Sequence, residues 1–190
     1  MLTGILLLLL NAAASFFTVL LLTRALMRWL RISFINPLGQ FILATTDWAV
    51  RPMQKVLPSR GGLDLSCWVP AWLIQVLLVL ATLWLGRHFE ASPFMLAGVL
   101  LIGAVELMRN LLHLVMIVVI VAAVLSWVNP RAPLAPLVNA LARPFLAPLA
   151  RRLPPVGGVD LSPLVVLLIV QVLLFVLTNL HLRIAAAFLA

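Results

Sequence analysis

The sequence predicts an all-α membrane protein of about four transmembrane helices, built as two tandem repeats in parallel orientation. Of its 190 residues, 65% are hydrophobic, and the mean hydropathy is +1.22. That is more apolar side chain than a soluble core of this size can bury. Four nearly uncharged runs each approach the ~20 residues that a spanning helix needs. A polar motif occurs once in each half of the chain, so we expect each repeat to be a helix, an amphipathic loop and a second helix.

The elements follow in order from these runs. The run that starts at Met1 is interpreted as a retained helix rather than a signal peptide, because no Lys or Arg precedes it. Each repeat has an even number of spans, so the two copies share one orientation across the membrane. The first repeat is expected over 1–92, with spans near 2–28 and 66–86 and an interfacial helical loop at 37–60. The second is expected over 93–190, with spans near 107–128 and 162–182 and a loop at 132–155.

The two halves share polar residues as well as apolar ones. Two similar apolar helices would not by chance also reproduce these polar positions. The motif Gly61, Gly62, Asp64 and Ser66 recurs as Gly157, Gly158, Asp160 and Ser162. Upstream, Trp29, Asn36-Pro37 and Arg51-Pro52 match Trp127, Asn129-Pro130 and Arg143-Pro144.

The charges predict the orientation. The net charge is +8, and most of the basic residues lie in the two loops rather than in a polar domain, so we expect no nucleic-acid partner. Positively charged loops stay cytoplasmic, which puts both termini on the non-cytoplasmic side. Each loop Lys or Arg contributes on the order of 1 kcal/mol of attraction to anionic headgroups. The loop residues are Arg28, Arg31, Arg51, Lys55, Arg60, Arg131, Arg143, Arg151 and Arg152, against Arg87 and Arg183 on the opposite side.

Both loops are predicted to be helical, because their apolar residues recur at three- and four-residue intervals. Pro52, Pro144 and Pro148 are expected to break them into short helices. These helices would lie in the headgroup region with Arg and Lys outward. The alternative is that they fold back onto the bundle as a lid.

The shared motifs favour structural roles. Gly-Gly-x-Asp-Leu-Ser could present backbone N–H groups to an anion, but capping of the next span by Asp64 or Ser66, and by Asp160 or Ser162-Pro163, explains it better. We expect each Asp to pair with Arg51, Arg143 or another loop arginine.

The residues at the ends of the first helix of each repeat are also interpreted structurally. We expect Asn36 and Asn129 to end their helices in the left-handed conformation, before a proline. Trp29 and Trp127 are predicted interface anchors. Arg24 and Arg28 are expected to extend to the headgroups.

A polar stripe on the third span is the strongest candidate for a functional site. Glu106, Arg109, Asn110 and His113 share one helix face by their spacing. Polar groups in a bilayer are costly unless paired or hydrated, which favours a function. The alternative is an exposed pair near the non-cytoplasmic surface, because a helix from Pro93 to Trp127 would be ~50 Å long against a ~30 Å core. Residues 94–105 would then lie along the membrane or pack elsewhere.

The sequence indicates no catalytic centre, cofactor or metal site. One cysteine, Cys67, excludes an internal disulfide and a cysteine cluster. His88, His113 and His181 lack metal-ligand spacing. Because no nucleophile lies beside a base, we expect no enzymatic activity.

The doubled motif resembles the YggT family, also called YlmG-like, and the resemblance covers nearly the whole chain. Ala122 stands where a second Arg24 would be, so a role for that arginine is not duplicated. The residues that carry the resemblance are Arg24, Trp29, Asn36-Pro37, Arg51-Pro52, Leu57-Pro58, Gly61-Gly62-x-Asp64, Ser126-Trp127, Asn129-Pro130, Arg143-Pro144, Leu153-Pro154 and Gly157-Gly158-x-Asp160-Leu161-Ser162-Pro163.

The resemblance implies a multi-pass protein of the bacterial inner membrane with no established reaction. It also implies associations with osmotic stress tolerance, potassium homeostasis, cell division and, in plastids, cytochrome assembly. We therefore expect a scaffold or assembly factor that contacts lipid headgroups and membrane protein partners yet to be identified. The alternative is a cation (potassium) channel or transport accessory, in which a homo-oligomer would form a ring from Glu106.

Overall fold

Six helices make up the regular structure of the residues that the computed structural model describes, which are 2–57, 64–86, 92–152 and 160–188. Four of them, α1, α3, α4 and α6, are long and apolar enough to cross a membrane. This confirms the predicted all-α fold with four candidate spans. The helices are α1 (Leu2–Trp29), α2 (Pro37–Val56), α3 (Leu65–Leu85), α4 (Pro93–Val128), α5 (Ala135–Ala150) and α6 (Ser162–Phe188).

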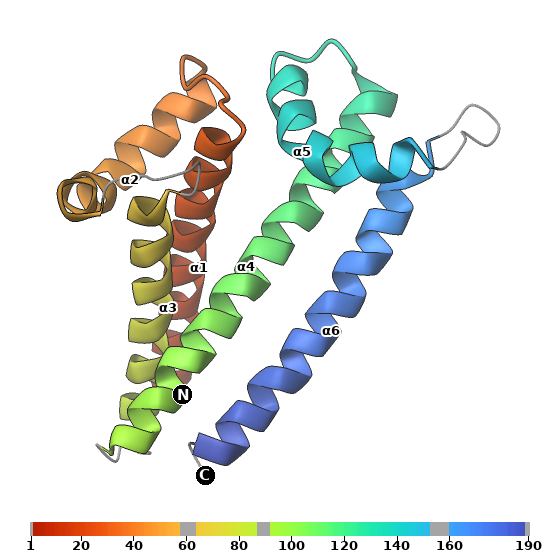
Figure 1. Cartoon of the computed structure of the whole chain (residues 1–190). Coiled ribbons are helices and arrows are strands. Elements are labelled where there is room, and N and C mark those ends of the chain that lie inside the picture. Colours follow the sequence, from red (N-terminus) through yellow and green to blue (C-terminus); the bar gives the residue numbers. More distant parts are fainter. Residues whose placement is uncertain (1, 58–63, 87–91, 153–159, 189–190) are drawn as a thin grey trace.

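The helices form two hairpins that each carry a shorter helix at one end. α1 packs on α3, and α4 packs on α6 (Figure 1). The shorter helices α2 and α5 lie at the same end of the molecule, and the two chain termini lie toward the other end (Figure 1). The two repeats therefore have the same orientation, as the sequence predicts.

The third span differs from the prediction because α4 is one continuous helix of 36 residues that begins at Pro93, not near 107. Ser92 caps it by accepting a hydrogen bond from Met95 N at 3.1 Å, and no proline follows Pro93 within the helix. Phe94 stacks on Phe188 of α6 at 4.5 Å between ring centroids. The early part of α4 therefore packs within the bundle. Its length is accommodated by inclination relative to α1 and α3 (Figure 1).

Both loops form helices, but the prediction that their prolines would break them was wrong. Pro52 lies inside α2, and Pro144 and Pro148 lie inside α5. A proline removes one ladder hydrogen bond, which bends a helix without ending it, and both helices change direction along their length (Figure 1). α2 packs against α1 and α3, whereas α5 packs against α4 and α6.

One face of α2 is buried against the spans, while other apolar side chains are exposed, including Trp48, whose ring still meets Phe17 of α1 edge-on. Gly39, Ile42, Thr46 and Val50 form the buried face. Phe41, Trp48 and Val56 are exposed. The helix thus combines features of both expected arrangements, a lid on the bundle and a surface for lipid.

α4 joins the two repeats. Its Leu107 and Leu114 belong to a large buried cluster with α1, α2 and α3, and its Val119 packs in a smaller cluster with Val166 of α6. α4 approaches α3 closely at Gly103, where an added Cβ would lie only 2.6 Å from Val76 Cγ2. A glycine here lets the two helices come together.

Neither Asn36 nor Asn129 ends its helix in the left-handed conformation that the sequence predicts. α1 ends with Arg31 at φ 54° and with Ile32 N donating to Met27 O at 2.8 Å, so the left-handed residue is an arginine. Asn36 instead starts α2, with φ −94° and its side chain accepting from Gly39 N at 2.7 Å. Asn129 does end α4, but at φ −152°, outside the left-handed region. The linker from Trp29 to Asn36 is longer than the one from Trp127 to Asn129, which gives the matching asparagines different positions.

Candidate functional site

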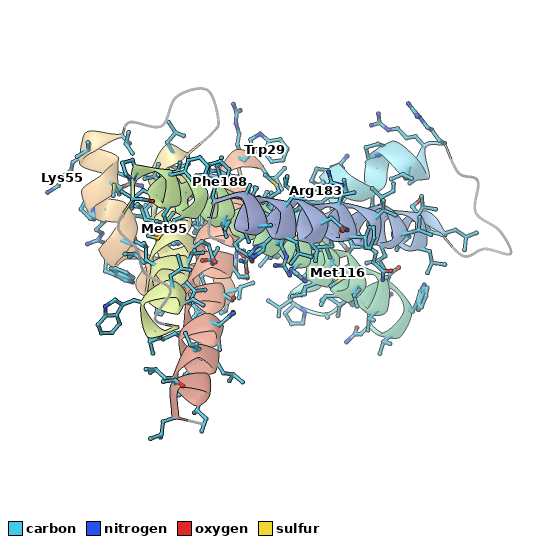
Figure 2. All side chains as sticks on the ribbon, turned by 90° about the horizontal axis from the view of Figure 1, so that it is seen from below. Trp29, Lys55, Met95, Met116, Arg183 and Phe188 are labelled. Carbon is cyan, nitrogen blue, oxygen red and sulfur yellow. The ribbon has the colours of Figure 1, made fainter. Side chains whose placement is uncertain are left out.

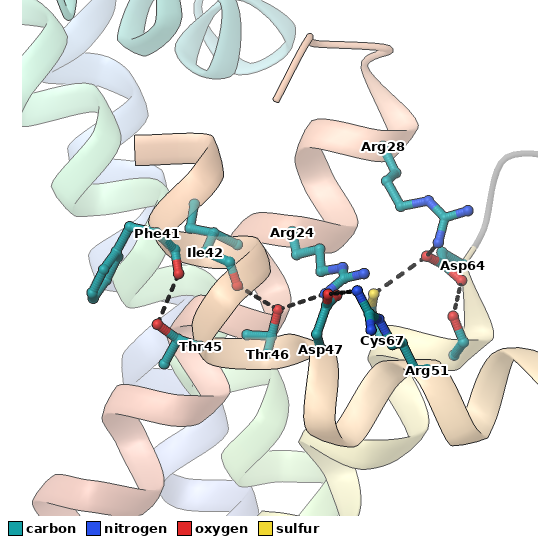
Figure 3. A network of polar contacts seen from close by, with 11 residues as sticks. Arg24, Arg28, Phe41, Ile42, Thr45, Thr46, Asp47, Arg51, Asp64 and Cys67 are labelled. Carbon is teal, nitrogen blue, oxygen red and sulfur yellow. Dashed lines mark hydrogen bonds and ion pairs between the residues drawn. The ribbon is translucent and has the colours of Figure 1, made fainter. Parts of the chain in front are cut away.

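Two groups of polar residues lie between the spans, one at each half of the bundle. The first, called here the α2 ion-pair cluster, joins α2 to α1 and joins α1 to the start of α3 (Figure 3). It consists of Arg24, Arg28, Thr46, Asp47, Arg51, Asp64, Ser66 and Cys67.

Arg24 is the centre of this cluster. Its side chain is only 6% exposed and donates from Nη1 to Thr46 Oγ1 and to Asp47 Oδ1, both at 2.8 Å. Asp47 also pairs with Arg51, at 2.8 Å, but the Arg51 side chain is 76% exposed. The expectation that Arg24 extends to the headgroups was therefore wrong, because α2 brings a carboxylate and a hydroxyl to it inside the bundle.

Asp64 forms the second half of the cluster, at the start of α3 and almost fully buried. It pairs with Arg28 rather than with Arg51, and Ser66 Oγ and Cys67 Sγ also bond to its carboxylate (Figure 3). Its side chain accepts no capping hydrogen bond from α3, so the predicted capping role was wrong here. The Asp64 carboxylate oxygens bond instead to the side chains of Arg28, Ser66 and Cys67. Gly61 and Gly62 lie outside the described residues.

The second repeat does not reproduce this cluster. Asp160 is exposed, and it caps α6 by accepting from Ser162 N at 2.8 Å. Here the predicted capping is observed, although by Asp160 and not by the Ser162 hydroxyl. Arg143 is exposed, and the positions matching Arg24 and Arg28 are Ala122 and Ser126. Within the described part of the chain, Asp160 therefore forms no ion pair like that of Asp64. Gly157 and Gly158 lie outside the described residues.

The predicted stripe on α4 is the second group. Arg109 Nη1 donates to Glu106 Oε1 at 2.7 Å, and Asn110 Nδ2 donates to Glu106 O at 2.9 Å. His113 Nδ1 lies 2.8 Å from Arg109 O. His181 of α6, which the sequence reasoning did not include, places Nδ1 2.8 Å from Glu106 Oε1. His181 lies far along the chain, so spacing on one helix could not have found it.

These residues line a cavity between all four spans, called here the interhelical pocket, with a volume of about 710 Å³. It reaches toward the end away from α2 and α5, since its lining includes Leu7 near the start of α1 and Leu83 near the end of α3. The Glu106 side chain is 20% exposed and that of Arg109 31%. Glu106 and Arg109 therefore form a partly buried pair on one face of α4, which His181 of α6 approaches, in the part of the bundle away from α2 and α5, rather than an open surface pair. The polar lining residues are Asn11, Ser15, Gln75, Thr82, Glu106, Arg109, Asn110, His113 and His181.

Gln75 supports this pocket from α3. It is 1% exposed, and its Nε2 donates to Thr18 Oγ1 of α1 at 2.8 Å. Its match in the second repeat, Gln171, is exposed. The two repeats thus share this glutamine but not its environment, because only Gln75 is buried between spans. Within the described ranges, no group of three His, Cys, Asp or Glu side chains is placed to hold a metal ion.

Four apolar spans, two repeats and polar groups enclosed between the spans define a multi-pass α-helical membrane protein. Comparison with protein families makes this more specific. The chain belongs to the CCB3/YggT family, whose model matches residues 3–85 and 101–181, one match for each repeat.

Bacterial relatives support this assignment. The chain is 30% identical over 166 residues to a protein named YggT of Escherichia coli strain K12, covering 87% of this chain and 85% of the relative. It is 33% identical over 175 residues to a Pseudomonas aeruginosa protein, covering 90% of this chain and 87% of that one. It is also 32% identical over 142 residues to a Vibrio alginolyticus protein, covering 74% and 76%. No solved structure matches the chain.

Proposed function

We propose that this chain is a non-enzymatic scaffold or assembly factor of the bacterial inner membrane, acting in membrane organisation, cell division or osmotic stress tolerance. The observation that supports it best is the α2 ion-pair cluster. Buried ion pairs often add little net stability and instead favour one geometry, and we extend that role to this protein. Here Arg24 of α1 holds α2 through Asp47, and Arg28 of α1 holds the start of α3 through Asp64, so that the three helices keep one arrangement. A helix held in this way presents a defined surface to a partner.

The charge distribution supports a cytoplasmic position for this surface. α2 and α5 lie at one end of the molecule (Figure 1), and their exposed basic residues would attract anionic headgroups there. Both termini would then face the non-cytoplasmic side. Among the described residues, the exposed basic side chains of this end are Arg31, Arg51, Lys55, Arg131, Arg143, Arg151 and Arg152.

The pairing of the carboxylates is the reason to propose a role without catalysis. Asp47, Asp64 and Glu106 are each bound by an arginine. These groups therefore serve the packing of helices in this proposal.

A cation transport accessory is the second candidate, and the interhelical pocket is the observation that favours it. Polar residues from four spans surround a cavity, as in many membrane transport proteins. However, Arg109 Nη1 already pairs with the Glu106 carboxylate at 2.7 Å. A cation that entered the pocket would therefore be repelled by the arginine. This charge arrangement favours the scaffold.

In-cell photocrosslinking tests the scaffold. A photoreactive phenylalanine analogue would replace Val56, which is 75% exposed on α2, and, as a matched control, Leu168, which is 66% exposed on the span α6. We expect position 56, but not position 168, to give a reproducible crosslink to a defined membrane protein. That crosslink should weaken when Arg24→Ala releases α2.

Lipid adducts alone at position 56 would contradict the scaffold. Flux measurements test the second candidate separately: cation flux through proteoliposomes of the native protein that disappears in Glu106→Gln would favour transport.

A further inference from the structure

The interhelical pocket has the size of a small-molecule site. Its volume is about 710 Å³, within the ~300–1,000 Å³ typical of ligand pockets. Its walls come from α1, α3, α4 and α6, and they include both polar side chains and apolar ones such as Val79 and Ile102. Such walls suit a molecule with both polar groups and a short carbon skeleton.

The charges in the pocket select against a simple ion. The ionisable side chains of its lining are Glu106, Arg109, His113 and His181, so one carboxylate faces one guanidinium when the imidazoles are neutral. A cation would be attracted by Glu106 but repelled by Arg109. An anion would be attracted by Arg109 but repelled by Glu106. A molecule with both charges and no net charge would be attracted by both residues, without adding net charge to a region of low dielectric constant.

Hydrogen-bonding groups in the lining provide further contacts. Arg109 uses Nη1 for Glu106, and its Nε has no hydrogen-bond partner among the described residues. From the facing helix α1, Asn11 and Ser15 contribute an amide and a hydroxyl. These groups lie on different spans, so a ligand that contacted both sides would join the two repeats.

We propose that the interhelical pocket binds a small zwitterionic group, with its anionic end at Arg109 and its cationic end at Glu106. This inference is independent of the scaffold function. The same chemistry has two sources: a soluble amino-acid-like zwitterion that enters from the non-cytoplasmic side, and the phosphoethanolamine headgroup of a membrane lipid. Both fit a pocket that reaches toward the end away from α2 and α5.

Thermal unfolding of the purified full chain in detergent micelles tests the proposal, with the fluorescence of its six tryptophans as the signal. The probes are glycine and glycerophosphoethanolamine, and the single-charge controls are choline chloride and sodium acetate at equal ionic strength. A ligand that binds the folded state raises the midpoint as its concentration increases. We expect at least one zwitterion, and neither control salt, to raise it.

Substitutions in the pocket test whether the stabilisation comes from binding there. Arg109→Gln and Glu106→Gln should each weaken binding by about tenfold or more, the range for loss of a charge-assisted hydrogen bond. Arg143→Gln is the matched control, because Arg143 is exposed on α5 and outside the pocket lining. If the two charge variants do not fold, Asn11→Ala on the exposed side of α1 still removes a pocket contact, and it should weaken binding about threefold.

The two sources give different results, and both support the zwitterion site. Stabilisation by glycine indicates a soluble ligand. Stabilisation by glycerophosphoethanolamine alone indicates a lipid headgroup. The proposal is overturned if neither probe stabilises the folded native protein, if choline or acetate does so equally, or if every pocket variant that folds binds like Arg143→Gln.

Discussion

Arg24 shows how one residue can be assigned the wrong environment when only its helix is considered. Near the end of a span, a long basic side chain is expected to extend to the headgroups. In the structure it is buried, because Thr46 and Asp47 of α2 supply an acceptor and a counter-charge at 2.8 Å. A buried charge of this kind tolerates the loss of its partner poorly.

The first prediction concerns this residue. Arg24→Ala should lower the free energy of unfolding by about 2 kcal/mol, because Thr46 and Asp47 would lose the buried donor of two hydrogen bonds and Asp47 would keep only the exposed Arg51. Arg51→Ala should cost under about 1 kcal/mol, because Arg51 pairs with the same carboxylate from an exposed position. Equilibrium unfolding in mixed micelles measures both variants. Equal losses would contradict the central role assigned to Arg24.

At the scale of the element, the matching asparagines allow a second comparison. Asn36→Ala should destabilise the protein by about 1 kcal/mol, because the side chain caps α2 at Gly39 N. Asn129→Ala should have little effect, because Asn129 is exposed and its bond to Leu125 O is made by the backbone. Thermal unfolding of the two variants side by side distinguishes them. If both substitutions reduce the stability of the protein equally, the two asparagines have the same role and this interpretation is wrong.

α4 is the element that joins the repeats, so its contact with α3 should be sensitive to volume. Gly103→Ala should destabilise by about 1–3 kcal/mol, because the new Cβ would meet Val76 Cγ2 at 2.6 Å and Val76 N at 3.2 Å. Gly4→Ala is the matched control: an added Cβ there meets nothing within 4 Å, and alanine is the better helix former. Equilibrium unfolding measures both, and a neutral Gly103→Ala would mean that the helices pack less closely than described.

At the scale of the whole molecule, the orientation can be tested by cysteine labelling. Native Cys67 is fully buried, so it stays unlabelled from either side and the native protein serves as background. Gly86→Cys, at the exposed end of α3, should react with an impermeant thiol reagent added to spheroplasts. Lys55→Cys, exposed on α2, should react only after the membrane is opened.

At this scale the two repeats also differ in the direction of their helix pairs and in their polar residues (Figure 2). Seen from the end of the termini, the α1 and α3 pair and the α4 and α6 pair run in different directions, with Lys55 and Arg183 on different parts of the molecule. The α2 ion-pair cluster belongs to the first repeat, and Glu106 with His181 belongs to the second. The repeats thus share an architecture but have different polar contents, which agrees with a pocket formed where they meet.

Much of the fold could be predicted from local pattern. Runs of apolar residues indicate spans because lipid tolerates only helices with satisfied backbone groups, and the three- and four-residue spacing indicates α2 and α5. The stripe of Glu106, Arg109, Asn110 and His113 could be predicted because all four residues lie on one helix, and the helical period alone places them on the same face. His181 and Asp47 were missed, because each meets its partner only through contact between different helices.

The sequence by itself determined the class, the four apolar spans, the doubled motif and the family, since these depend on composition and on spacing along the chain. The tertiary structure decided which charges are buried, which motif copies cap helices and where a pocket lies. Those features depend on distances between helices that are remote in sequence, such as 2.8 Å from Arg24 to Asp47. A periodic pattern gives the direction in which a side chain points, but only packing supplies its partner.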